Sequence, residues 1–119
     1  MYFIQPTRTI PNLDQVLDTL PSLQMINVDD IHLYDPTIIA IADVNDFIDY
    51  QWSLPTIVIA YEHEGAQLSQ AWEMGALAGW LWSRLPANPE KALSKIDAQY
   101  KRNQDSRDLP SAAALQKKI

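Results

Sequence analysis

The chain has 119 residues, and its hydrophobic share of 47% and charged share of 20% are those of an ordinary globular protein. This length predicts one domain that buries one hydrophobic core. No apolar run is long enough to span a membrane, the first residues lack the pattern of a secretory signal, and the absence of cysteine excludes disulfides and fits a cytoplasmic protein.

The net charge of −6 hides an uneven distribution along the chain. Residues 1–83 contain eleven acidic residues and only one basic residue, Arg8, whereas residues 84–119 contain eight basic and four acidic residues. Because phosphate contacts dominate nucleic-acid affinity, the acidic body argues against nucleic-acid binding by this domain. The basic end is typical of the solvated face of a helix, and attraction to an anionic surface is the alternative.

The first part of the chain is expected to hold a strand, a helix and a second strand. The apolar run 2–4 is stopped by Pro6 and predicts a buried strand. Pro11 suits the first turn of a helix, which Pro21 ends. The apolar residues between these prolines fall at helical spacing and are Leu13, Val16, Leu17 and Leu20. Residues 23–28 predict the second strand.

The middle part predicts two short helices and two further strands. Residues 29–35 are polar and have room for about one turn of helix. The continuous apolar run 37–42 fits a strand that is covered on both faces. A brief helix is expected within 44–53, and residues 56–60 predict the next strand. The side chains expected to turn inward from this helix are Phe47, Ile48 and Trp52.

The last part predicts a longer helix, a fifth strand over 79–82 and a final helix. The longer helix has the i, i+3, i+4, i+7 stripe of a helix packed on a sheet, and the stripe comprises Leu68, Ala71, Trp72 and Gly75. Asn88 is a good N-cap, and Pro89 suits the first turn of the final helix. The inner face of that helix is expected to comprise Leu93, Ile96 and Tyr100.

Strands that alternate with helices predict an α/β fold with a parallel sheet and right-handed crossovers. At this length the common solution is an open five-stranded sheet in the order 2-1-3-4-5, a flavodoxin-like three-layer sandwich. The shortened second and third helices would leave one face thinly covered. Residues 1–104 are expected to form this domain. Residues 105–119 read as a polar link and the start of a helix capped by Ser111, which leads to an effector domain or is a frayed tail.

Residues 54–86 combine an apolar strand, an amphipathic helix that ends in Gly75-Ala76, a short aromatic strand and Pro86. This pattern resembles the last third of a response-regulator receiver domain, and the resemblance extends over residues 2–104. It implies a receiver-like fold and a role in two-component signal transduction. That family has an acidic pair after strand 1, a phospho-accepting Asp after strand 3, a Thr or Ser after strand 4 and a Lys after strand 5. The carboxylates hold Mg²⁺, and the metal, the hydroxyl and the ammonium neutralise the incoming phosphoryl group.

Most positions that carry this chemistry depart from the family pattern. Gln5 and Pro6 stand where the acidic pair is expected, Ala60 stands in place of the Thr or Ser, and Ser83 in place of the Lys. Asp43 remains as the candidate phospho-acceptor, and a turn-capping role is its alternative. The resemblance therefore indicates a degenerate receiver, or pseudo-receiver, whose function does not require phosphorylation.

Four aromatic residues are expected to form a switch or interface, and they are Trp72, Trp80, Trp82 and Tyr100. Trp80 stands at the position of the family's switch aromatic. Trp80 and Trp82 share one face of the fifth strand because side chains alternate along a strand. In receivers this strand and its flanking helices are a common dimer or partner surface, so the expected partner is another protein, a fused effector domain or a second copy.

The sequence predicts neither an enzyme nor a cofactor or metal site. The run Glu62-His63-Glu64 invites a metal interpretation, but three adjacent loop residues rarely converge on one ion, and a solvated loop is expected. The three glycines form no phosphate-binding loop. The leading hypothesis is a phosphorylation-independent interaction module. The alternatives are a phosphorylatable receiver that uses Asp43 and a small-molecule sensor that uses a cleft beside the short helices.

Overall fold

A computed structural model describes the backbone of residues 1–20 and 23–118 and the side chains of residues 1–20 and 23–103. Within these residues, five parallel strands form a sheet in the predicted order β2-β1-β3-β4-β5. The strands are β1 (Tyr2–Ile4), β2 (Gln24–Ile26), β3 (Ala40–Asp43), β4 (Thr56–Ala60) and β5 (Ala78–Leu81). The α-helices are α1 (Leu13–Thr19), α2 (Val44–Tyr50), α3 (Gly65–Glu73) and α4 (Pro89–Lys118), and the 3-10 helices are η1 (Val28–Leu33) and η2 (Glu62–Glu64). The predicted α/β sandwich is confirmed.

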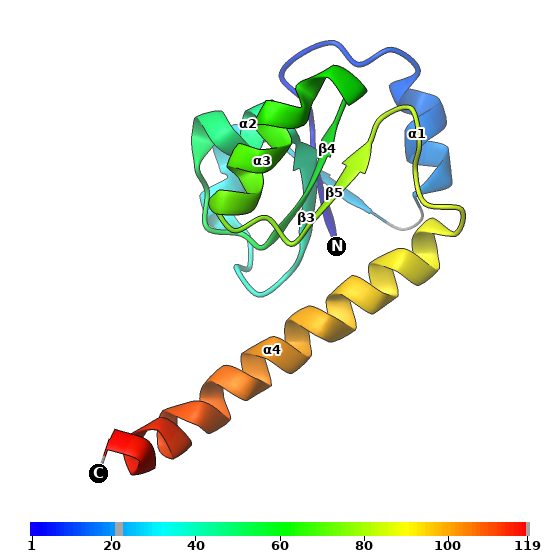
Figure 1. The fold of residues 1–119 in the computed structure, drawn as a ribbon. Helices are drawn as coiled ribbons and strands as arrows, with labels where there is room; N and C mark the ends of the chain where they lie inside the picture. The colour runs from blue at the N-terminus through cyan, green and yellow to red at the C-terminus, as the bar shows by residue number, and fades with distance from the viewer. Residues whose placement is uncertain (21–22, 119) are drawn as a thin grey trace.

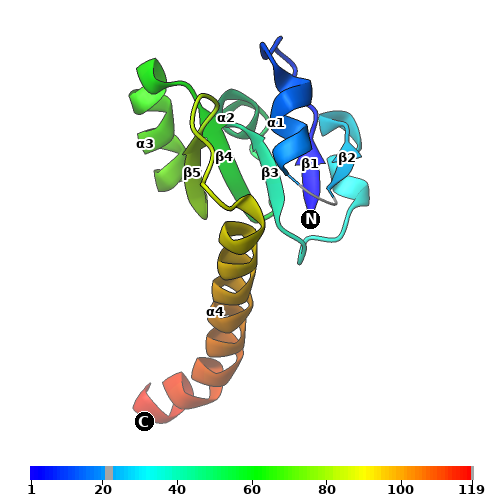
Figure 2. The same cartoon turned by 90° about the vertical axis from the view of Figure 1, so that its right-hand side faces the viewer.

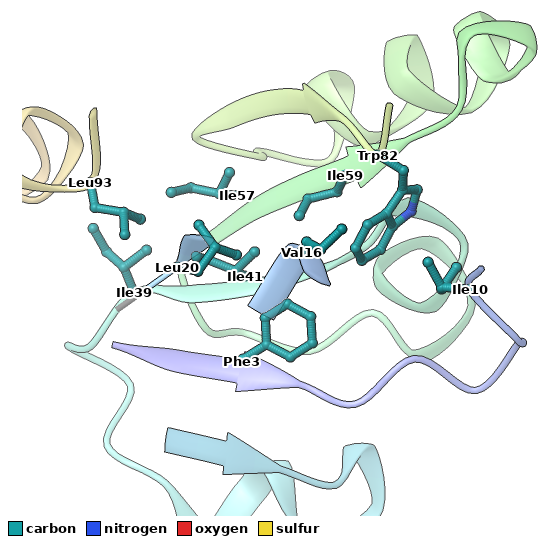
Figure 3. Packing of buried hydrophobic residues seen from close by; sticks show 10 residues of the cluster. All are labelled: Phe3, Ile10, Val16, Leu20, Ile39, Ile41, Ile57, Ile59, Trp82 and Leu93. Carbon is teal, nitrogen blue, oxygen red and sulfur yellow. The ribbon is translucent and has the colours of Figure 1, made fainter. Parts of the chain in front are cut away.

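Helices cover both faces of the sheet (Figures 1 and 2), and apolar side chains form a layer on each face. Alternate residues of β4 point to opposite sides, as the two-residue period of a strand requires. Ile57 and Ile59 pack toward α1 and the start of α4, whereas Val58 and Ala60 pack toward α2 and α3. Figure 3 shows the first of these layers. Its buried members are Phe3, Ile10, Val16, Leu20, Ile39, Ile41, Ile57, Ile59, Trp82 and Leu93.

Strand β3 begins at Ala40, three residues later than predicted. The side chain of Asp35 accepts hydrogen bonds from the backbone N–H and the hydroxyl of Thr37, at 2.9 and 2.7 Å. The backbone N–H of Ile38 also donates to the carbonyl of Asp35. These contacts hold residues 35–38 in a turn, so the apolar run enters the sheet only after it. The strand then continues through Asp43, which was predicted to follow it.

The predicted inward stripe of α3 is correct for Ala71 and wrong for Trp72. Ala71 is fully buried, whereas Trp72 is 54% exposed. A Cβ placed on Gly79 would lie 3.1 Å from the side chain of Leu68 and 3.9 Å from the indole nitrogen of Trp72. Gly79 lies on the edge strand β5, so Trp72 extends over the rim of the sheet, where there is little protein to cover it.

Helix α4 starts as the sequence predicts, since the Asn88 side chain accepts a hydrogen bond from the backbone N–H of Lys91 at 3.1 Å. Leu93 is buried on the sheet, and Ile96 and Tyr100 pack against the same layer. The predicted interruption before Ser111 is wrong, because the backbone is helical without a break over 89–118. The polar segment 104–108, which was expected to be a link, contains neither glycine nor proline and so has no residue that ends a helix.

The later turns of α4 project away from the sheet (Figures 1 and 2). Whether residues 105–119 belong to a separate functional unit stays a prediction. In the described part of the chain, no helix has the length and apolarity needed to cross a bilayer.

We predict that Leu93→Ala lowers the free energy of unfolding by roughly 2 to 5 kcal/mol, because it empties a buried site between α4 and the sheet. Urea unfolding followed by circular dichroism measures this change. The control is Ser94→Ala on the exposed side of the same helical turn, with an expected effect below about 0.5 kcal/mol. Equal stability of both variants would contradict the packing of α4 on the sheet.

Candidate functional site

The candidate site lies where the carboxyl ends of the parallel strands meet. In open parallel sheets this edge collects the segments that follow each strand, and it is the usual place for function. Here it receives the loop after β1, the end of β3, the 3-10 helix after β4 and the residues after β5. The side chains that these segments bring together are Arg8, Asp43, Glu64 and Trp82.

The guanidinium of Arg8 bridges two buried carboxylates. Its Nη2 atom donates to Oδ1 of Asp43 and to Oε1 of Glu64, each at 2.7 Å, and its Nη1 atom donates to Oε2 of Glu64 at 2.9 Å. The side chains of Asp43 and Glu64 are 0% and 4% exposed, and that of Arg8 is 31% exposed. The Tyr61 ring lies beneath the guanidinium, with 5.1 Å between its centroid and Cζ, in a cation–π contact.

Both carboxylate oxygens of Glu64 are satisfied. Besides the bonds from Arg8, Oε1 accepts from the backbone N–H of Tyr61 at 2.9 Å, and Oε2 accepts from the Asn45 side chain at 3.1 Å. Burial by itself raises the pKa of Glu64, but the hydrogen bonds from Arg8 and Tyr61 favour the charged form and lower its pKa on balance. The same contact with Glu64, with help from Asp43, raises the pKa of Arg8. The pair is therefore ionised at neutral pH.

Asp43 is held less completely than Glu64. Its Oδ1 accepts from Arg8 and, at 2.9 Å, from the indole Nε1 of Trp82. Its Oδ2 is buried and has no hydrogen-bond partner among the described residues. Asp43 occupies the N-cap position of α2 but makes no side-chain cap bond, so its alternative role as a turn-capping residue is wrong. Its carboxylate pairs with Arg8 instead.

A third carboxylate holds the loop that carries Arg8. Asp46 is 2% exposed and accepts from the backbone N–H of Thr7 at 3.1 Å and from the Thr7 hydroxyl at 2.5 Å. Thr7 and Arg8 are therefore both fixed by acidic side chains from the β3–α2 junction and from η2. No group of three or more metal-ligating side chains suited to an ion occurs in the part of the chain that the structure describes.

The positions singled out by the resemblance to receivers contribute little to this cluster. Gln5 is exposed and its backbone N–H donates to the carbonyl of Ile26, and Pro6 is half-buried. Ala60 is fully buried at the end of β4. The Ser83 hydroxyl is exposed and donates to Oε1 of Glu62. Charge at this edge thus comes from residues outside the family's positions, with the exception of Asp43.

The four predicted interface aromatics lie in different environments. Trp82 is 6% exposed and packs in the core beside Ile59, so its expected place on a partner surface is wrong (Figure 3). Trp80 and Tyr100 are half-buried against the same layer, and Trp72 is exposed. The expectation that Trp80 and Trp82 share one face is confirmed, since both join that layer.

Sequence reasoning missed Arg8 and assigned Glu64 to a solvated loop, which the structure corrects. Glu64 is 3% exposed, because η2 turns its side chain inward while Glu62 and His63 stay outside. One signal could have found Arg8. It is the only Lys or Arg among residues 1–83, which also contain eleven acidic residues. A single cation among so many carboxylates is expected to form an ion pair.

The cleft predicted beside the short helices is present between η1 and the chain after α2. Its volume is about 430 Å³, and its walls include Ile31, Tyr34 and Trp52. The Trp52 indole N–H is already bonded to the Thr56 hydroxyl at 2.7 Å.

We predict that Arg8→Ala destabilises the domain by about 3 to 5 kcal/mol, because it leaves two buried carboxylates without a cation. Arg8→Lys should fall between this variant and the wild type, since one ammonium does not reproduce the two-pronged contact. Urea unfolding measures both, and exposed Arg84→Ala is the control for charge. A loss below about 1 kcal/mol in Arg8→Ala would contradict the bridging role.

A second prediction concerns acid. Because the folded-state pKa of Glu64 lies below its ordinary value of 4.5, its charge stabilises the fold above about pH 4.5, and this contribution is lost as the pH falls through the folded-state pKa. The stability gap between the wild type and Glu64→Gln should therefore be widest near neutral pH and narrow toward pH 3. Unfolding midpoints between pH 3 and 7 test this, with exposed Glu73→Gln as the control. A gap independent of pH would refute the assignment.

Comparison with protein-family models, with curated proteins and with solved structures finds no match to this chain. The strand-end edge combines one guanidinium, the two buried carboxylates that share it and an indole N–H.

Proposed function

We propose that this domain is a regulatory interaction module of the degenerate receiver type, which acts through protein contacts and without phosphorylation. The observation that carries this proposal is the ion pair between Arg8 and Asp43. Asp43, the candidate phospho-acceptor, is already paired with the side chain of Arg8 in the same chain.

Phosphoryl transfer to an aspartate requires an accessible carboxylate oxygen and positive charge that neutralises the phosphoryl group. Asp43 is 0% exposed, and its Oδ1 atom accepts from Arg8 and Trp82. The charge of Arg8 is already matched by its paired bonds to Glu64. A phosphoryl group on Asp43 would bring further negative charge next to a second buried carboxylate. These contacts favour the phosphorylation-independent hypothesis over the phosphorylatable one.

The surface that we assign to the partner is the rim formed by α3 and β5, defined by Trp72 and Gly79. Trp72 is 54% exposed, and Gly79 on the edge strand is also exposed. Tryptophan is among the residues that contribute most to binding energy at interfaces, and an unpaired strand edge beside it offers further contact area. A protein partner or a second copy would cover this rim.

We predict that the protein acquires no phosphoryl group on Asp43 when it is incubated with acetyl phosphate and Mg²⁺. Intact-mass spectrometry measures the adduct, and titration with beryllofluoride and Mg²⁺ followed by tryptophan fluorescence measures the noncovalent equivalent. We expect no adduct and no saturable change. A saturable, Mg²⁺-dependent response that Asp43→Asn abolishes would overturn the proposal.

The rim is tested by self-association. If a second copy covers Trp72, Trp72→Ala should raise the dissociation constant by a factor on the order of ten or more, with an unchanged unfolding midpoint. Sedimentation equilibrium measures the dissociation constant of the wild type and of the variant. Leu33→Ala is the matched control, because Leu33 is 71% exposed on η1, away from the rim. Association of Trp72→Ala equal to that of the wild type would remove the second copy as the occupant.

A further inference from the structure

A groove of about 560 Å³ runs between α1 and the segment that joins β5 to α4. These two parts of the chain lie beside each other in both ribbon views (Figures 1 and 2). One wall consists of Asn12, Gln15 and Val16, and the other includes Leu85 and Pro86. The volume falls within the range of about 300 to 1,000 Å³ that is typical of small-molecule sites.

The chemistry of the lining is selective. Every residue that lines the groove is uncharged, although the body that surrounds it contains eleven acidic residues. The floor is apolar, since Val16 is 9% and Trp82 is 6% exposed. The lining residues with hydrogen-bonding side chains are Asn12, Gln15, Thr19, Tyr61 and Ser83. The hydroxyls of Thr19 and Ser83 already donate to the carbonyl of Val16 and to Glu62. Such a lining offers no counter-ion to a charged ligand and favours an uncharged one.

The groove also touches the ion network and the base of α4. Trp82 lines the groove and donates its indole N–H to Asp43. Tyr61 lines it as well, while its ring lies under Arg8 and its backbone N–H donates to Glu64. Pro89, the first residue of α4, closes the far side. A ligand here would contact two residues that hold the network and the first turn of the projecting helix.

We propose that this groove is a binding site for an uncharged, largely apolar small molecule, and that a molecule bound there changes the surroundings of the ion network and of the base of α4. The proposal stands independently of the interaction function assigned to the α3–β5 rim, because the two surfaces share no residue. It also places the ligand on the opposite side of the sheet from the cleft beside η1.

The test uses N-phenyl-1-naphthylamine, an uncharged fluorescent probe with a largely apolar surface, and the full chain. We expect saturable binding of one probe per chain, with a dissociation constant on the order of 10 to 100 μM. Gln15→Phe places a ring in the groove. Because the ring takes up space and contacts that the probe would use, the dissociation constant should rise at least about fivefold. Asp18→Phe, exposed on α1 outside the groove, is the matched control and should bind as the wild type does.

A second readout locates the probe. In ¹⁵N-correlated NMR spectra, the indole N–H of Trp82 and the backbone amides of the non-proline residues between 87 and 92 should shift on titration, whereas signals from Ile31 and Trp52 in the other cleft should not. Ala87→Trp fills the groove from its opposite wall and keeps the test decisive if Gln15→Phe fails to fold. Absence of saturable binding, undiminished binding by the groove variants, or shifts confined to other surfaces would each overturn the proposal.

Discussion

The strand-end edge of this domain depends on a single guanidinium. Two carboxylates, of Asp43 and Glu64, lie almost wholly out of water, and charge removed from water is costly unless it is paired. Arg8 pairs with both of them and also makes a cation–π contact with Tyr61. The loop after β1, the end of β3 and the 3-10 helix after β4 are thereby tied to one another through side chains. One guanidinium thus offsets part of the negative charge that the two carboxylates bring to this edge.

The arrangement reverses the charges that the receiver resemblance implies. There, acidic residues follow strand 1 and a cation follows strand 5; here the cation Arg8 follows β1, and β5 is followed by Trp82, whose indole N–H donates to Asp43. An exchangeable metal ion and an incoming phosphoryl group would be replaced by a counter-ion that belongs to the chain. This built-in cation supports the proposal that the domain works through contact surfaces, and Trp72 at the rim is the exposed residue proposed to meet a partner.

The sheet could be predicted from sequence because buried parallel strands are short, continuous apolar runs whose signal is local, as β4 illustrates. The ion network could not, since Arg8 and Glu64 are separated by 56 positions and meet only once the strands are ordered. Local periodicity also identifies the inward face of a helix without showing where the sheet beneath it ends. The pattern therefore predicts an inward Trp72, although this side chain lies exposed at the rim of the sheet. Trp82 was misplaced for a related reason, because alternation along β5 does not tell which face is covered.

Helix α4 extends far beyond the sheet on which its first turns pack (Figures 1 and 2). Its 30 residues correspond to a length of about 45 Å at the ordinary rise per residue. Among its described side chains, Leu93, Ile96 and Tyr100 pack against the sheet layer, beside the groove that contains Trp82. A rod anchored at one end acts as a lever, so a tilt of about 5° at its base would displace its far end by about 4 Å. Rearrangements too small to disturb the core would be magnified tens of ångströms away.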